Sequence, residues 1–213
     1  MTPKLVIVAA PSGAGKTTLC DALLQDYPEL VYSVSCTTRE PRGLEEDGVD
    51  YHFLTKEAFE RLVAEGAFLE HAVVHGNCYG TLAAPIRDAL GQGLSVLLDI
   101  DVAGAAQVRA HLAALPEGDP LRDGIVDIFI SPPSAAELRR RLENRGEDSP
   151  ETIERRIRNA EGEMARRGEF RYNVVNDELL VAYKELCAIL EHENAVPGPG
   201  NTEECACGHH HHH

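Results

Sequence analysis

The fold is decided by residues 4–10, KLVIVAA, which run directly into residues 11–17, PSGAGKT. Residues 4–10 are a continuous, largely apolar and β-branched run, which is typical of a strand buried on both faces of a parallel sheet. Glycines follow, and then a helical stretch from Lys16 to about Asp26. We therefore predict a strand–loop–helix unit at the start of the chain.

Residues 10–17, APSGAGKT, fit the P-loop pattern with Ala10 in place of the first glycine. Glycines let backbone N–H groups turn toward phosphate oxygens, and a helix N-terminus adds partial positive charge. Lys16 is then expected to reach the β- and γ-phosphates of ATP, and the Thr17 hydroxyl to ligate Mg²⁺. The alternative is a chance glycine-rich turn, but a buried strand before the loop and a helix after it favour the P-loop. The expected ATP contacts are Pro11, Ser12, Gly13, Ala14, Gly15, Lys16, Thr17 and Thr18.

Strand and helix patterns alternate along the rest of the chain. Strand patterns occupy residues 31–35, 51–54, 67–81, 94–101, 125–130 and 172–175. Helical patterns occupy residues 55–65, 85–91, 103–115, 149–167 and 178–192, and a further helix is expected to begin at Ser134. Residues 116–124 are expected to be a polar loop, and Ser134 with Glu137 has the spacing of a capping box. The alternation predicts a three-layer α/β/α fold whose mainly parallel sheet is covered by helices on both faces.

Two carboxylates end the strand pattern of residues 94–101, LSVLLDID. Ligands of open α/β sheets bind at the carboxyl ends of the strands, where Asp99, Asp101 and the glycine loop fall together. Asp99 has the position of the acidic residue that orients Mg²⁺ in P-loop proteins. A solvated carboxylate at a strand end is the alternative, and the preceding P-loop favours the metal role.

The composition of the chain limits the classes of protein to which it can belong. The chain has 213 residues, of which 43% are hydrophobic and 26% charged, as in an ordinary globular protein. We find no apolar run of the ~20 residues that span a bilayer and no signal-peptide pattern, so we expect no membrane partner and a cytoplasmic protein. A net charge of −15 argues against nucleic-acid binding. The six cysteines lack zinc spacing and are expected to be reduced thiols, including Cys205 and Cys207 in a tail, 196–213, that ends in a purification tag.

A longer series of motifs, all in one order, resembles the guanylate kinase family. The motifs are SVSCTTREPR (33–42), DY (50–51), FLEHA (68–72), GNCYGT (76–81), LDID (98–101), PPS (132–134), RL with RG (141–146) and VND (175–177). The resemblance covers about residues 4–192. It implies transfer of the γ-phosphoryl group of ATP to GMP, giving ADP and GDP. It also implies a P-loop core at 1–35, 82–133 and 159–195, a GMP-binding insertion at 36–81 and a lid at 134–158.

The resemblance assigns a GMP site. Arg39, Arg42, Tyr51 and Tyr79 match the positions that bind the phosphate, Glu70 and Ser35 match those that read guanine, and Gly80, Thr81 and Asp101 match further contacts. A carboxylate can accept from the guanine N1–H and amine together, whereas adenine presents a lone pair at N1. Taken singly, the arginines could be surface charges, the glutamate an exposed carboxylate and the tyrosines packing residues. Their ordered occurrence after a P-loop favours the functional interpretation.

Arginines are dense in the implied lid. Arg145 and Arg156 match the family's catalytic arginines and, with Lys16 and Arg42, complete the expected catalytic set. Arg141 and Asn176 match contacts to ATP. Charged helix faces are normally just solvated, but phosphoryl transfer needs charge stabilisation, which lid arginines would supply on closure.

Two other functions stay open at this point. One is a guanylate-kinase-like module that binds proteins, which the intact Lys16, Thr17 and Asp99 disfavour; the other is a P-loop kinase for a different small substrate. The sequence departs from the family pattern at Gly43-Leu44 and at Ala103, where a glutamine is usual. It leaves the oligomeric state undetermined.

Overall fold

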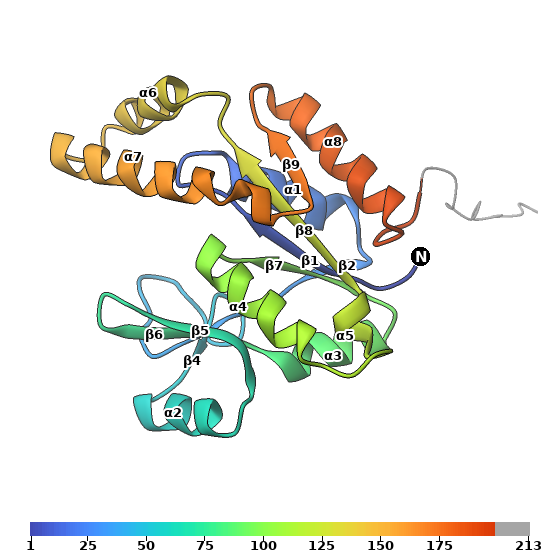
Figure 1. The fold of residues 1–213 in the computed structure, drawn as a ribbon. Helices are drawn as coiled ribbons and strands as arrows, with labels where there is room; N and C mark the ends of the chain where they lie inside the picture. Colours follow the sequence, from blue (N-terminus) through green and yellow to red (C-terminus); the bar gives the residue numbers. More distant parts are fainter. Residues whose placement is uncertain (199–213) are drawn as a thin grey trace, which may run out of the picture.

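The computed structural model describes residues 1–198 and has a central sheet of five strands (Figure 1). The order across this sheet is β2 (Leu30–Tyr32), β7 (Ser95–Asp99), β1 (Leu5–Ala9), β8 (Ile125–Ser131) and β9 (Tyr172–Val175). Every neighbouring pair is parallel. The predicted parallel α/β sheet is therefore confirmed, and the carboxyl ends of all five strands lie at one edge.

Helices cover both faces of this sheet, and strand β1 shows why. Val6 and Val8 pack with α1 (Lys16–Asp26) and α8 (Leu179–His192), whereas Leu5 and Ile7 pack with α3 (Ala83–Gly91), α4 (Val102–Ala113) and the short α5 (Pro120–Asp123). Successive side chains of a strand point to opposite faces, so a strand buried between two layers must be apolar throughout. Figure 1 shows α8 and α4 on opposite sides of the sheet.

A second, four-stranded sheet lies beside the core. Its order is β4 (His52–Phe53), β3 (Cys36–Thr37), β6 (Asn77–Leu82) and β5 (Phe68–Val74), with helix α2 (Lys56–Ala64) packed on it. Cys36, Phe59 and Phe68 form its small core. Strands β5 and β6 are joined by a tight turn in which His75 and Gly76 both have positive φ, as the type I′ turn of a two-residue hairpin requires.

Helices α6 (Ala135–Arg145) and α7 (Pro150–Ala165) project from the core near the carboxyl edge of the central sheet (Figure 1). A short 3₁₀ turn follows α7 at Arg167–Glu169. Ser134 and Ser149 cap them by accepting from the backbone N–H groups three residues on. The predicted capping box is only half formed, because the Glu137 carboxylate binds Arg140 and Arg141 instead of the Ser134 backbone.

Several expected boundaries were wrong. Residues 116–124 are not all loop: Asp119 accepts from Leu121 N and begins helix α5, which buries Leu121. The strand expected at 31–35 is β2 at Leu30–Tyr32, and the helix expected from Pro85 begins at Ala83. The tail at 199–213, with Cys205, Cys207 and the tag, lies outside the described residues. Among residues 1–198, none of the helices has the length and apolarity to cross a membrane.

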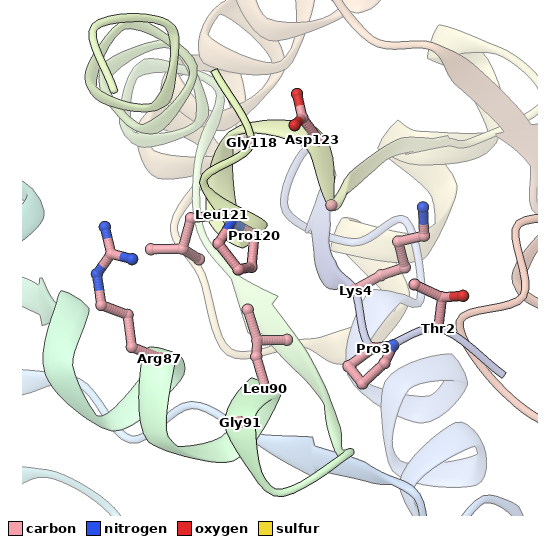
Figure 2. A pocket seen from close by; sticks show the side chains of 11 residues that line it. Thr2, Pro3, Lys4, Arg87, Leu90, Gly91, Gly118, Pro120, Leu121 and Asp123 are labelled. Carbon is pink, nitrogen blue, oxygen red and sulfur yellow. The ribbon is translucent and has the colours of Figure 1, made fainter. Parts of the chain in front are cut away.

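Helix α5 also walls a pocket of about 460 Å³ at the amino-terminal edge of the sheet (Figure 2). Thr2, Pro3 and Lys4 precede β1 and form one side of the pocket, and Leu90, Pro120 and Leu121 are among the other lining residues. Because P-loop proteins bind ligands at the opposite, carboxyl edge, this pocket is not the expected site.

We expect Gly80→Ala to destabilise the second sheet. A methyl group there would lie 2.8 Å from the Phe68 ring and 3.2 Å from that of Phe59, and these rings already stack with centroids 4.6 Å apart. Overpacking of this kind costs about 1–3 kcal/mol in the free energy of unfolding, measurable by denaturant melts. The control is Gly162→Ala in α7, where no atom lies within 4 Å and stability should rise slightly. Equal stability of both variants would contradict the packing argument.

Candidate active site

The glycine loop after β1 adopts the conformation that anion binding requires. Gly13 and Gly15 have φ of 86° and 84°, a left-handed backbone that side chains disfavour. Gly15 is the N-cap of α1 and contributes no side-chain cap, so the first backbone N–H groups of the helix remain available to a ligand. Loop and helix together have the geometry that was predicted for a phosphate cradle.

Lys16 and Asp99 form an ion pair beside this cradle. Asp99 is the last residue of β7 and is in register with Val8 of β1, so the parallel sheet delivers it next to the loop. Thr17 follows on the first turn of α1, where its side chain is exposed. A carboxylate and a hydroxyl are hard oxygen donors of the kind that Mg²⁺ takes alongside water and substrate phosphates. The donor set therefore fits the expected ion.

Asn176 ties the P-loop to the far end of the chain. Its buried side-chain amide donates to the Ala14 carbonyl at 2.8 Å, and its backbone N–H donates to Ser131 at the end of β8. A methyl group on Gly15 would lie only 2.4 Å from the Asn176 amide nitrogen. The sequence suggested a contact with ATP, but it gave no signal of this direct support for the loop.

A second pocket, of about 400 Å³, gathers most of the predicted GMP residues. Its lining includes Ser35, Tyr51, Glu70, Tyr79, Gly80, Asp99 and Asp101. Tyr32, Glu45 and Asp50 also line it and were missed by the sequence analysis. Because Asp99 both lines this pocket and pairs with Lys16, the pocket adjoins the P-loop.

Glu70 owes its orientation to a β-bulge. The register of β5 with β6 shifts between Phe68 and Glu70, so Phe68, Leu69 and Glu70 are all buried in succession. The Thr81 hydroxyl donates to Glu70 Oε1 at 2.8 Å. Burial raises the pKa of Glu70, the Thr81 hydrogen bond lowers it, and the nearby Asp101 carboxylate raises it further. Thr81, which was expected to touch GMP, is itself fully buried against the carboxylate.

Arg39 is held by a partner that the sequence did not suggest. Glu45 accepts from both terminal nitrogens of its guanidinium, at 2.7 and 3.0 Å, and also from the Arg42 backbone N–H. The Arg39 hydrogen bonds lower the pKa of Glu45 to about 2. The guanidinium lies 5.0 Å from the Tyr51 ring centre and is only 9% exposed, whereas Arg42 is exposed.

The lid arginines fall into two settings. Arg141 and Arg145 line a pocket of about 470 Å³ with Gly13, Gly15 and Asn176, and Arg141 also donates to the Asn176 carbonyl. Arg156 lies on α7 and pairs with Asp148 at 3.1 Å. The structure thus brings Arg141 and Arg145 to the P-loop side, and joins Arg156 to the loop between the two helices.

Asp101 lines the second pocket and also caps helix α4, because its carboxylate accepts from the Gly104 backbone N–H.

Fold and site together define a P-loop nucleotide-binding protein of the three-layer α/β/α class. The family model described as "Guanylate kinase" matches residues 2–193. The chain is 50% identical to a guanylate kinase of Anaeromyxobacter dehalogenans over 190 residues, 89% of this chain and 80% of that protein. It is 47% identical to one of Alkalilimnicola ehrlichii, over 89% of this chain and 88% of that one.

A solved structure agrees with these relatives. The crystal structure of guanylate kinase from Anaplasma phagocytophilum has a TM-score of 0.67 and 32% identity, and the match covers 90% of this chain and 86% of that one. The chain belongs to the guanylate kinase family, as the motifs indicated.

We expect Asn176→Ala to loosen the P-loop. The variant leaves the Ala14 carbonyl without its donor, at a cost of roughly 1–3 kcal/mol. The melting temperature should fall and the KM for ATP should rise more than the KM for GMP. Asn144→Ala is the matched control, since Asn144 lines the same pocket but is exposed. If both variants behave alike, the tether does not support the loop.

Proposed function

We propose that this chain transfers the γ-phosphoryl group of ATP to GMP, giving ADP and GDP. One observation carries the proposal: the pocket that contains Glu70 and the tyrosines shares Asp99 with the P-loop, through its ion pair with Lys16. A phosphate acceptor bound in that pocket would therefore lie beside a donor bound on the loop. Such adjacency is what direct in-line transfer between two nucleotides requires.

The reaction needs little covalent chemistry from the protein. A phosphate oxygen of GMP attacks the γ-phosphorus, the bond from that phosphorus to the β,γ-bridging oxygen breaks, and ADP leaves with the electron pair. In our proposal Arg39, Arg42, Tyr51 and Tyr79 hold the GMP phosphate. The P-loop backbone from Pro11 to Thr18 holds the phosphates of ATP, and Lys16 balances charge that develops on the transferred group.

Glu70 and Ser35 are proposed to select the base. Glu70 is buried and oriented by Thr81, so its carboxylate can accept from the guanine N1–H and amine together. Ser35 lines the same pocket and can donate to O6. Adenine would leave the buried carboxylate facing a lone pair, which a site built on hydrogen bonds rejects strongly.

Mg²⁺, held by Thr17 and Asp99 and by substrate phosphates, would neutralise charge on the β- and γ-phosphates when bound. We propose that residues 134–158 act as the lid and residues 36–81 as the GMP-binding unit. The proposed lid boundary falls inside α7, which runs unbroken to Ala165. Closure would bring Arg145 and Arg156 to the transferred group and exclude water.

A cytoplasmic location is supported by four unpaired thiols among the described cysteines.

The direct test is ADP release with GMP, AMP, CMP and UMP compared side by side. Turnover should be far faster with GMP, and Lys16→Ala and Arg42→Ala should each lose roughly 100-fold or more because each removes a charge from the transition state. Lys184→Ala and Arg61→Ala are exposed controls on α8 and α2 and should stay active. Fast turnover with another monophosphate would favour a different P-loop kinase; absence of turnover in the folded protein would favour a binding module.

Replacing Glu70 tests base recognition. Glu70→Gln exchanges an acceptor oxygen for a donor amide, so the KM for GMP should rise and the ratio of kcat/KM between GMP and AMP should narrow. Because burial raises the pKa of Glu70, the KM of the unaltered enzyme should also rise as pH falls toward the acid range, through protonation above the ordinary carboxyl pKa. The Glu70→Gln variant should lack the part of the KM increase that comes from protonation of Glu70. The titration of GMP itself affects both proteins equally, so comparing them removes its contribution. An unchanged GMP/AMP ratio would exclude Glu70 as the reader of the base.

Closure of the lid should be visible by small-angle scattering. A non-hydrolysable ATP analogue with GMP should reduce the radius of gyration, since bound phosphates let the arginines of residues 134–158 converge. Either ligand alone serves as the control and should compact the protein less. Identical radii under all conditions would argue against a moving lid.

A further inference from the structure

Glutamine 107, on helix α4, clasps the strand that carries Glu70. Its side-chain oxygen accepts from the His71 backbone N–H at 3.1 Å, and its side-chain amide donates to the His71 carbonyl at 3.1 Å. His71 is the residue directly after Glu70 on β5. The pair of bonds imitates the pattern that a neighbouring strand would offer.

The two Gln107 hydrogen bonds lie on an edge strand, close to a β-bulge. Strand β5 is an edge strand of the second sheet, and its outer peptide groups have no neighbouring strand to pair with. Its inner ladder is interrupted by the bulge between Phe68 and Glu70. The bulge disrupts the ladder locally, and Gln107 pairs the strand from outside at His71, one residue beyond Glu70, where the regular ladder resumes.

The same helix approaches Glu70 one turn earlier. A methyl group on Gly104 would lie 3.4 Å from Glu70 Oε2 and 3.1 Å from Asp101 Oδ1, so helix and carboxylate are in close contact there. Residues three apart on a helix share a face, so Gly104 and Gln107 present one surface to β5. Gly104 sets how near the helix comes, and Gln107 sets how the strand is aligned along it.

We propose that Gln107 is a positioning residue for guanine recognition, which acts by holding the Glu70 carboxylate in place against the base. The inference rests on the proposed function of Glu70. Gln107 does not line the GMP pocket and is exposed, so its effect must pass through the strand. Loss of the clasp frees Glu70 to move with its bulge, and a misplaced carboxylate reads the base less well.

The test uses Gln107→Met, which keeps the length of the side chain and its helix propensity but offers no hydrogen-bonding amide. The KM for GMP should rise about 3- to 10-fold, as expected for one to two modest hydrogen bonds. The KM for ATP should stay within twofold, and the GMP/AMP ratio of kcat/KM should fall. Gln25→Met is the control, an exposed glutamine on α1, and should match the unaltered enzyme.

A double variant separates positioning from general loosening of the fold. If Gln107 acts through Glu70, adding Gln107→Met to Glu70→Gln should raise the KM for GMP no further than Glu70→Gln alone. Additive increases, or a KM for ATP that rises in parallel, would overturn the proposal. So would a Gln107→Met enzyme with unaltered KM and base preference. If the unaltered chain fails to phosphorylate GMP, it is the proposed function that fails, and calorimetric titration of GMP into the same variants still tests the clasp.

Discussion

The rest of the site depends on a loop that must turn its backbone N–H groups toward phosphate. The loop does so through two left-handed glycines, Gly13 and Gly15, and such a backbone is costly unless its surroundings fix it. Asn176 supplies that support by donating to Ala14, and it leaves no room for a side chain on Gly15. The first loop of the fold is thus stabilised by a residue that follows its last strand, which couples nucleotide binding to completion of the whole sheet.

Three of the cations around the site have carboxylate partners within the protein. Lys16 pairs with Asp99, Arg39 with Glu45 and Arg156 with Asp148. The protein has a net charge of −15, so its carboxylates outnumber its cationic side chains. A cationic side chain that a carboxylate already holds in one geometry loses less conformational freedom when a phosphate binds to it. The bidentate grip of Glu45 uses part of the Arg39 guanidinium and leaves the remaining donors near the tyrosines of the pocket. Substrate phosphates would therefore join existing pairs in an already ordered site.

Sequence reasoning succeeded where the signal is local. The apolar run of β1, the glycine loop and helix that follow it, and the Ser134 cap of α6 follow from neighbouring residues, and the structure confirms them. Helix α5 was missed because it has only four residues and hides in a polar stretch. The family resemblance named most residues of the GMP pocket, and their roles remain predictions.

What sequence could not supply is contact between distant segments. The Asn176 tether, the Gln107 clasp and the bulge at Glu70 join residues that the chain alone does not bring together, and no local propensity encodes them. The Arg39–Glu45 pair spans only six residues, yet the loop between them has no periodic pattern from which to infer it.

Two contacts between distant segments start from residues 99–107. This segment begins with Asp99 beside the P-loop, continues through Asp101, the N-cap of α4, and ends at Gln107 on the strand of Glu70. Only Ile100 and Asp101 separate the end of β7 from the first residue of α4, Val102. One short segment thus contacts both Lys16 of the P-loop and the strand that carries Glu70. In the proposed reaction, this segment would link the pocket for the base to the site of the transferred phosphate.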